Sequence, residues 1–297
     1  MSATNRGHQI LADAIREHYN LGEVGQPYPV PDAHQRRHRK MLVDTGAGRF
    51  LIKTYPRDAV VLDALRFQHR LSDHLAENGL PVARIQRAKN RRRVIEIDDW
   101  AMELQEYVEG ESMRVTAATL SVAAAALGKF HEVCRDLPRP ARESRMWRFS
   151  EVPRATFAAL FERARAEAAE SVLNPLCNAI GLFLQEAGKA LDWDARGQFE
   201  TGLIHGDWHS ANLLFRGDEL VAILDLEFAG EGCFLEDLAY AVSSLCVRNG
   251  SEPKALEQRT HVLLKHYQTF RKLAYAEEIA LYYAVGVKQI ASVCCQI

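Results

Sequence analysis

The N-terminal part of the chain alternates short apolar runs with polar turns, whereas the rest carries apolar residues at helical spacing. Residues 42–45 and 50–52 are two β-rich runs separated by a segment with two glycines. Glycines at this place supply the turn of a β-hairpin. Pro56 then ends the second strand, because proline cannot donate a ladder hydrogen bond. The pattern therefore predicts a strand-rich stretch from about residue 24 to 55.

Helices are expected on both sides of this hairpin. Residues 57–77 place Ala64, Leu71 and Leu75 on one stripe, as an amphipathic helix does, and Gly79 marks its end. The other elements predicted for this part are a short helix at 8–18 and strands at 92–97 and 101–107, with a turn at Asp98 and Asp99.

After Gly110 the helical spacing dominates. Leu120, Ala124 and Leu127 recur at helical intervals, and only residues 202–226 interrupt the pattern with short strands. Further helices are predicted at 155–170, 173–192, 234–247, 253–273 and 275–293.

Together these elements predict an α+β fold of two lobes. A small β-rich lobe would span residues 1–104, a hinge 105–110, and a larger, mostly helical lobe 111–297. Ligands prefer the cleft between two such lobes, so a binding site is expected there.

Composition narrows the class of protein. The chain has 297 residues, of which 47% are hydrophobic and 26% charged, as in an ordinary globular protein. Its formal net charge of -2 gives no general attraction to nucleic acid or to an anionic membrane. No apolar run could span a bilayer and no signal core is present, so a cytoplasmic protein is expected. The six cysteines are scattered, which favours reduced, buried thiols over a zinc site.

Two basic clusters lie at residues 34–40 and 89–93. Such clusters bind nucleic acid in some proteins. They also protect exposed strand edges from pairing with other chains, and this second interpretation is preferred here. No nucleic-acid partner is therefore expected, and the oligomeric state is not predicted.

Polar residues interrupt apolar runs in two adjacent segments, 203–215 and 222–227. A buried carboxylate is costly unless it is paired or bound to a metal. Asp207 and Asp225, with an asparagine and two histidines nearby, therefore indicate a functional site.

A hairpin brings these two segments together. Gly217 and Asp218 predict a two-residue turn that places Asn212 opposite Ile223. Asp225 then shares a sheet face with Asn212, as a diagonal neighbour. An amide oxygen and a carboxylate at this spacing suit Mg²⁺.

The motif His205-Gly206-Asp207-x-His209-x-x-Asn212, followed by Asp225 and Asp237-Leu238-Ala239, resembles the aminoglycoside phosphotransferase and choline kinase superfamily. This superfamily of small-molecule kinases has a protein-kinase-like fold and includes type II homoserine kinases. The resemblance covers about residues 8 to 275, and its catalytic segment is highly specific. It implies an ATP- and Mg²⁺-dependent phosphotransferase that acts on a hydroxyl of a small molecule.

The resemblance also assigns roles. Asp207 would accept the proton of the substrate hydroxyl, while Asn212 and Asp225 would hold Mg²⁺ on the ATP phosphates. Lys53 would pair with the phosphates. Gln68 stands where family members usually carry a glutamate that orients this lysine. The backbone of the hinge would bind adenine, at Gln105, Glu106, Tyr107 and Val108.

The neighbours of the motif have several interpretations. His205 is expected to brace the loop, and Asp237 to stabilise the catalytic region. His209 would either touch the substrate or fix the loop backbone. Trp208 would either face the acceptor or pack. Glu227 would bind a second metal or contact the acceptor, or it has no functional role.

Two other functions stay open on sequence alone. Residues 206–209 match the start of a dinuclear metallophosphoesterase motif, although the further metal-binding clusters of that class are missing. A catalytically silent kinase-like binding module is the other, although the presence of Lys53 and the motif carboxylates favours activity. The acceptor is homoserine or another hydroxy amino acid, an amino alcohol, an aminoglycoside or a sugar. Trp147 and Phe149 would line its pocket or simply pack.

Overall fold

Alternating apolar positions in the N-terminal strands build one antiparallel sheet with the strand order β1-β2-β3-β5-β4. The turn of the predicted hairpin lies between Thr45 and Gly48, which pair across it. Gly48 has a φ of 124°, which favours glycine. The strands are β1 (Tyr28–Pro29), β2 (Arg39–Thr45), β3 (Gly48–Pro56), β4 (Val94–Ile97) and β5 (Trp100–Glu106).

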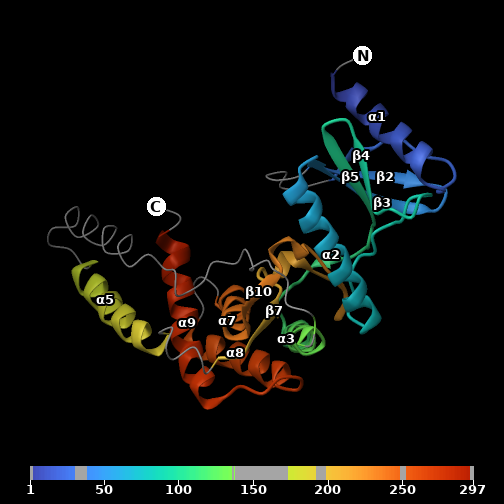
Figure 1. Cartoon of the computed structure of the whole chain (residues 1–297). Helices are drawn as coiled ribbons and strands as arrows, with labels where there is room; N and C mark the ends of the chain where they lie inside the picture. Colours follow the sequence, from blue (N-terminus) through green and yellow to red (C-terminus); the bar gives the residue numbers. More distant parts are fainter. Residues whose placement is uncertain are drawn as a thin grey trace. The chain divides into compact units, whose positions relative to one another are not determined.

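Figure 1 shows the computed structural model, which describes residues 3–30, 39–135, 137, 173–191, 199–247 and 252–294. The chain divides into two compact units. The first comprises residues 1–110 with 221–224, and the second residues 111–220 with 225–297. The first is built on a sheet and the second is mainly helical, so the predicted α+β class is confirmed.

The register of the first sheet separates its side chains into two faces. Ile52 pairs with Met41 and Leu104, and these three residues lie in a buried core. Helix α1 (Ala3–His18) adds its own apolar side chains to that core, including Ile15, which is 0% exposed. The other face carries Lys53 and its cross-strand partners, because adjacent residues of a strand point to opposite faces.

Helix α2 (Ala59–Glu77) lies against this second face. Asp58 caps it by accepting the backbone N–H groups of Val60 and Val61. On its predicted stripe, Leu71 and Leu75 are buried, whereas Ala64 and Gln68 are half-buried. The buried polar residues of α2 are Ser72 and His69, and His69 directly follows Gln68.

The second unit is a set of packed helices. Helix α3 packs along α8, and both α5 and α7 pack along α9. The approach of α3 to α8 requires Gly128, because a Cβ there would lie 2.5 Å from the carbonyl oxygen of Tyr267. The helices are α3 (Ala117–Cys134), α5 (Leu173–Ala190), α7 (Phe234–Leu245), α8 (Pro253–Tyr267) and α9 (Tyr275–Cys294).

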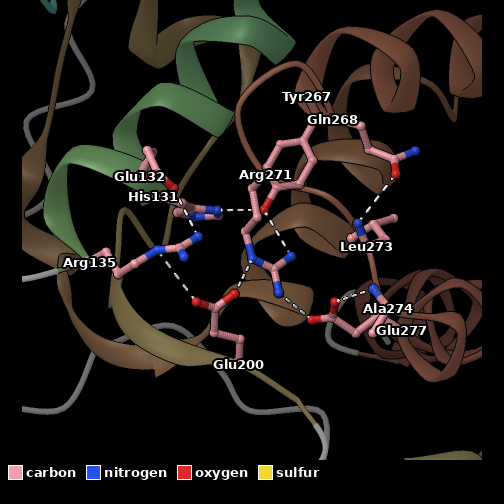
Figure 2. Close-up of polar contacts among 10 residues, drawn as sticks. All are labelled: His131, Glu132, Arg135, Glu200, Tyr267, Gln268, Arg271, Leu273, Ala274 and Glu277. Atoms are coloured by element: carbon pink, nitrogen blue, oxygen red, sulfur yellow. Dashed lines mark hydrogen bonds and ion pairs between the residues drawn. The ribbon is translucent and has the colours of Figure 1, made fainter.

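Helix α8 ends six residues before the predicted boundary of 273. The chain leaves the helix at Gln268, whose side chain accepts the backbone N–H of Leu273. Glu277 then accepts the backbone N–H of Ala274 at the start of α9 (Figure 2). These two side chains replace helical hydrogen bonds in the turn, which apolar spacing does not reveal.

Short strands accompany these helices. The hairpin predicted at Gly217 and Asp218 is confirmed between β8 and β9. Strand β10 was not predicted, because its sequence contains two glycines and lacks a β-rich pattern. The strands are β6 (Glu111–Ser112), β7 (Thr201–Ile204), β8 (Leu213–Arg216), β9 (Glu219–Ile223) and β10 (Gly230–Cys233).

Several expectations concern residues outside those described, namely the helix at 155–170 and the placement of Trp147 and Phe149. Cys134, Cys233 and Cys246 are free and buried, as predicted. Over the described ranges, no helix is both long and apolar enough to cross a bilayer.

Candidate active site

A buried carboxylate holds the loop that carries Asp207. Asp237, in the first turn of α7, is 0% exposed and accepts the backbone N–H groups of His205 at 2.9 Å and Gly206 at 3.0 Å. Gly206 has a φ of 80°, a conformation that costs a residue with a Cβ about 1–2 kcal/mol. These contacts fix the backbone immediately before Asp207 and agree with the stabilising role expected of Asp237.

Asp237 is positioned by His131 of α3. His131 Nε2 lies 3.0 Å from the Asp237 carboxylate, and its Nδ1 lies 2.8 Å from the hydroxyl of Tyr267. Burial lowers the pKa of His131 although Asp237 favours its charged form, so the ring is neutral. A carboxylate only accepts, so Nε2 carries the hydrogen and Nδ1 accepts from Tyr267.

The chain of buried polar groups continues to α9 through Arg271 (Figure 2). Arg271 donates to the Tyr267 hydroxyl at 3.4 Å, to Glu277 at 2.5 Å and to Glu200 at 2.8 Å. The side chains of Arg271 and Glu277 are each 2% exposed. Arg271 thus links Tyr267 of α8 to Glu277 of α9. Tyr267 in turn contacts His131, the partner of Asp237.

Asp207 receives several hydrogen bonds. Its Oδ1 accepts from the hydroxyl of Tyr240 at 2.7 Å, and its Oδ2 accepts from the side-chain amide of Asn212 at 2.9 Å. His209 Nε2 lies 3.3 Å from the same Oδ2. Burial raises the pKa of Asp207, but the hydrogen bonds from His209 and Tyr240 outweigh the effect of burial and bring the pKa to about 2. Asp207 is therefore a carboxylate at neutral pH.

His209 fixes the loop and touches the carboxylate. It precedes the short 3₁₀ helix η2 (Ser210–Asn212), and its Nδ1 accepts the backbone N–H of Ala211 at 3.2 Å. Because Nδ1 accepts, the ring hydrogen lies on Nε2, which donates a hydrogen bond to Asp207. Of the two roles considered for His209, the structure supports the fixing of the loop backbone.

Trp208 was expected either to face the acceptor or to pack. Its side chain is 0% exposed and its ring packs edge-on against Phe130 and His205. This burial favours the packing interpretation over contact with an acceptor. His205 is also fully buried, and its Nδ1 accepts the backbone N–H of Asp207 at 3.2 Å, as expected of a bracing residue.

The sheet geometry predicted for Asn212 and Asp225 is wrong. Asn212 lies in η2, before β8 begins, and β9 ends at Ile223. Asp225 has a φ of 53° and precedes a second 3₁₀ helix, η3 (Leu226–Phe228), which contains Glu227. A shared strand face therefore cannot relate these side chains, because a left-handed residue breaks the strand alternation.

Sequence reasoning missed Tyr240 as a partner of Asp207. Tyr240 follows Asp237 by three residues in α7, and such residues lie on the same side of a helix. That spacing was the available signal, since Asp237 was already expected to support the catalytic region. Lys288 of α9 lies over the Tyr240 ring, 4.8 Å from its centre.

Lys53 lies in the middle of β3 in the first unit. It pairs with Lys40 of β2 on one side and with Glu103 of β5 on the other. Glu103 is 3% exposed and bonds to Tyr55 and His69. Gln68, predicted as the neighbour of Lys53, is half-buried on α2.

The predicted hinge overlaps the end of β5. The backbone N–H of Glu106 donates to the carbonyl of Arg84 at 2.9 Å, and that of Tyr107 donates to the carbonyl of Arg49 at 3.1 Å. Two backbone N–H groups of the predicted hinge are thus used within the unit. Within the described part of the chain, no group of three or more histidine, cysteine, aspartate or glutamate side chains could hold a metal ion.

Asp237→Asn is expected to loosen the catalytic loop. The new amide NH₂ would face one of the donors that Asp237 now binds, so a buried donor would lose its acceptor, at a cost of about 1–3 kcal/mol in unfolding free energy. Urea unfolding would measure this loss, and turnover should fall with it. Asp218→Asn, in an exposed turn, is the matched control. Wild-type stability of the Asp237 variant would contradict the assignment.

The chain is similar to known phosphotransferases. A model of the phosphotransferase enzyme family matches residues 30–273. A homoserine kinase of Nitrobacter hamburgensis is 26% identical over 272 residues, which are 91% of this chain and 78% of the relative. A homoserine kinase of Methylobacterium nodulans is 28% identical over 274 residues, 90% of this chain and 78% of the relative.

Solved structures show the same fold. An amicoumacin kinase in complex with AMP-PNP and Ca²⁺ matches with a TM-score of 0.67 at 13% identity, over 99% of this chain and 88% of that chain. A microcompartment-associated aminopropanol kinase matches with a TM-score of 0.63 at 19% identity, over 96% and 88%. The expectation of a protein-kinase-like fold is confirmed.

Proposed function

Because the chain belongs to the phosphotransferase enzyme family, we propose that it phosphorylates the hydroxyl of homoserine or a closely similar hydroxy amino acid, with ATP as donor. Membership makes it a small-molecule kinase with an alcohol acceptor. The finer choice of acceptor is supported by the relatives named homoserine kinase, which match over most of their length.

The observation that carries the proposal is the environment of Asp207. A carboxylate has about four acceptor positions. Among the described residues, Oδ2 receives two hydrogen bonds and Oδ1 receives that of Tyr240 alone. The second position on Oδ1 would accept the acceptor's hydroxyl. With a pKa of about 2, Asp207 is a weak base, so it would mainly orient the hydroxyl and take its proton late in the transfer.

The residues near Asp207 also fit Mg²⁺. Asn212 uses its amide NH₂ for two hydrogen bonds to Asp207, so its amide oxygen is the atom that a metal would bind. Asp225 would supply a carboxylate oxygen, and its left-handed backbone is a strain of the kind found at functional sites. When bound, Mg²⁺ would neutralise charge on the phosphates. Glu227 would contact the ammonium group of the acceptor.

In the first unit, Lys53 would bind the nucleotide phosphates. For adenine, the N–H groups of Glu106 and Tyr107 are already bonded, so the backbone of Val108 and the carbonyl of Glu106 are the better choices. Gln105 donates its side-chain amide to the carbonyl of Ala83, which supports a structural role for that side chain.

A coupled ADP-release assay tests the acceptor. Homoserine should give a higher kcat/KM than an amino alcohol, an aminoglycoside or a sugar, because only it carries both charged groups of the proposed substrate class. A preference for another acceptor would overturn the choice of homoserine while leaving the kinase class intact. No ADP release above the acceptor-free rate with any of them would contradict activity on these acceptors.

Asp225→Asn is expected to raise the Mg²⁺ concentration needed for half-maximal activity by about 10-fold or more, because Mg²⁺ is usually held by only one or two protein carboxylates. A titration of turnover against Mg²⁺ at saturating ATP would measure the shift. Asp218→Asn, which changes an exposed carboxylate in the nearby turn, should leave the titration unchanged. An unaltered Mg²⁺ requirement in the Asp225 variant would remove Asp225 from the metal site.

A further inference from the structure

Glu103 is a buried carboxylate to which the proposed function assigns no role. It lies in β5 of the first unit and is 3% exposed. A buried carboxylate is costly unless neighbours compensate for the lost water. The neighbours of Glu103 fix its orientation and its charge.

Two buried side chains hold the carboxylate in one orientation. The hydroxyl of Tyr55 donates to Oε1 at 2.9 Å, and His69 Nε2 lies 2.7 Å from Oε2. Burial raises the pKa of Glu103, but the hydrogen bond from His69 and the positive charge of Lys53 bring the pKa below its usual range. The group is therefore ionised and His69 donates to it. Within the described part of the chain, each oxygen accepts one of these bonds and keeps a further acceptor position.

Lys53 is directly opposite Glu103 in the antiparallel register, so both side chains project from the same face of the sheet. Directly opposed residues have Cβ atoms about 4.5–5.5 Å apart. On its other side Lys53 is opposed by Lys40, a like charge that disfavours a close approach of the two ammonium groups. The carboxylate opposite Lys53 is therefore that of Glu103 in β5.

We propose that Glu103 is the positioning residue that orients Lys53 toward the nucleotide phosphates, and that Tyr55 and His69 hold Glu103 for this purpose. The carboxylate thus comes from the neighbouring strand, whereas Gln68 occupies the helix position from which a glutamate was expected. His69, the next residue of α2, acts indirectly by donating to Glu103. This inference rests on the proposed function, because it assigns Lys53 to the phosphates.

Glu103 would have a purely structural role if it only accepted the hydrogen bonds of Tyr55 and His69. A positioning role predicts that a change at Glu103 affects only ligands with phosphates, whereas a structural role predicts no such dependence. Glu103→Gln keeps the shape and one acceptor oxygen but removes the charge. It should weaken binding of AMP-PNP by about 10-fold or more and leave binding of adenosine unchanged, because adenosine has no phosphate. A structural role alone would affect both ligands equally or neither.

Lys53→Met is the second arm of the experiment. The double variant Lys53→Met, Glu103→Gln should bind AMP-PNP no more weakly than Lys53→Met alone, since Glu103 acts through the lysine. Glu96→Gln is the matched control, because Glu96 is a carboxylate of the same sheet that pairs with the exposed Arg57. Tyr55→Phe removes one support of Glu103 without removing the charge, and should give a smaller loss confined to AMP-PNP.

The outcomes separate the inference from its premise. If Lys53→Met weakens AMP-PNP binding but Glu103→Gln and Tyr55→Phe do not, the role of Glu103 is wrong and the proposed function stands. If Lys53→Met also binds as the wild type does, the assignment of Lys53 fails, and the inference fails with it. Should Glu103→Gln unfold, the Tyr55→Phe result decides: equal losses for AMP-PNP and adenosine would overturn the inference.

Discussion

Replacing Asp207 with Asn is expected to lower kcat by about 10²–10⁴-fold, the usual contribution of a positioned base. The amide has nearly the same shape and can still accept the hydrogen bond of Tyr240 on Oδ1. The amide cannot take up the proton of the acceptor hydroxyl. It also lacks the negative charge that orients this hydroxyl. Steady-state turnover with homoserine and ATP would measure the loss.

Nucleotide binding should separate this effect from misfolding. The dissociation constant of AMP-PNP is expected to stay close to that of the wild type, because Asp207 is assigned to the acceptor and not to the nucleotide. Asp218→Asn again serves as the control for a loss of one carboxylate. Turnover within a few-fold of the wild type in the Asp207 variant would mean that another group orients the hydroxyl.

The pKa of Asp207 also sets an expectation for pH. Its value of about 2 lies below the ordinary value of 3.8, so the ionised form persists as the pH falls and is lost only as the pH approaches 2. An acid limb of kcat/KM above about pH 4 should therefore come from another group. The stability that the ionised form contributes is present above about pH 4 and is lost toward pH 2.

Replacing Arg271 with Met should produce the largest loss of stability, about 3–5 kcal/mol in unfolding free energy. Glu277 would then be a buried carboxylate without its cation, and Tyr267 and Glu200 would lose a donor (Figure 2). Methionine keeps part of the apolar stem of the side chain, so lost charge rather than lost volume dominates. Urea unfolding monitored by fluorescence would measure the change.

Two further variants test whether the loss comes from the buried ion pair. Arg135→Met removes an arginine that also contacts Glu200 but is 43% exposed, and a surface change of this kind usually stays within about 0.5 kcal/mol. Adding Glu277→Gln to Arg271→Met should recover part of the loss, because glutamine keeps an acceptor for Ala274 and carries no charge. A destabilisation equal to that of Arg135→Met would show that the buried group carries little stability.

Local patterns predicted many elements because their causes are local. The cap at Asp58 and the apolar stripe with Leu71 and Leu75 define α2 within one segment of chain. The turn at Gly217 and Asp218 likewise depends on two neighbouring residues. Where polar side chains bond to the backbone of a turn, apolar spacing gave the wrong boundary, as at the end of α8.

The sequence by itself determined the α+β class and the motif with Asp207, because spacing along the chain encodes helical periodicity, turns and a catalytic loop. Only the tertiary structure decided which distant groups meet. Tyr240 reaches Asp207 across 33 positions, His131 reaches Asp237 across 106, and Glu103 faces Lys53 only through the register of two strands. Such pairs form because buried polar groups must find partners. Which partner each finds depends on the packing of whole elements, which no local pattern records.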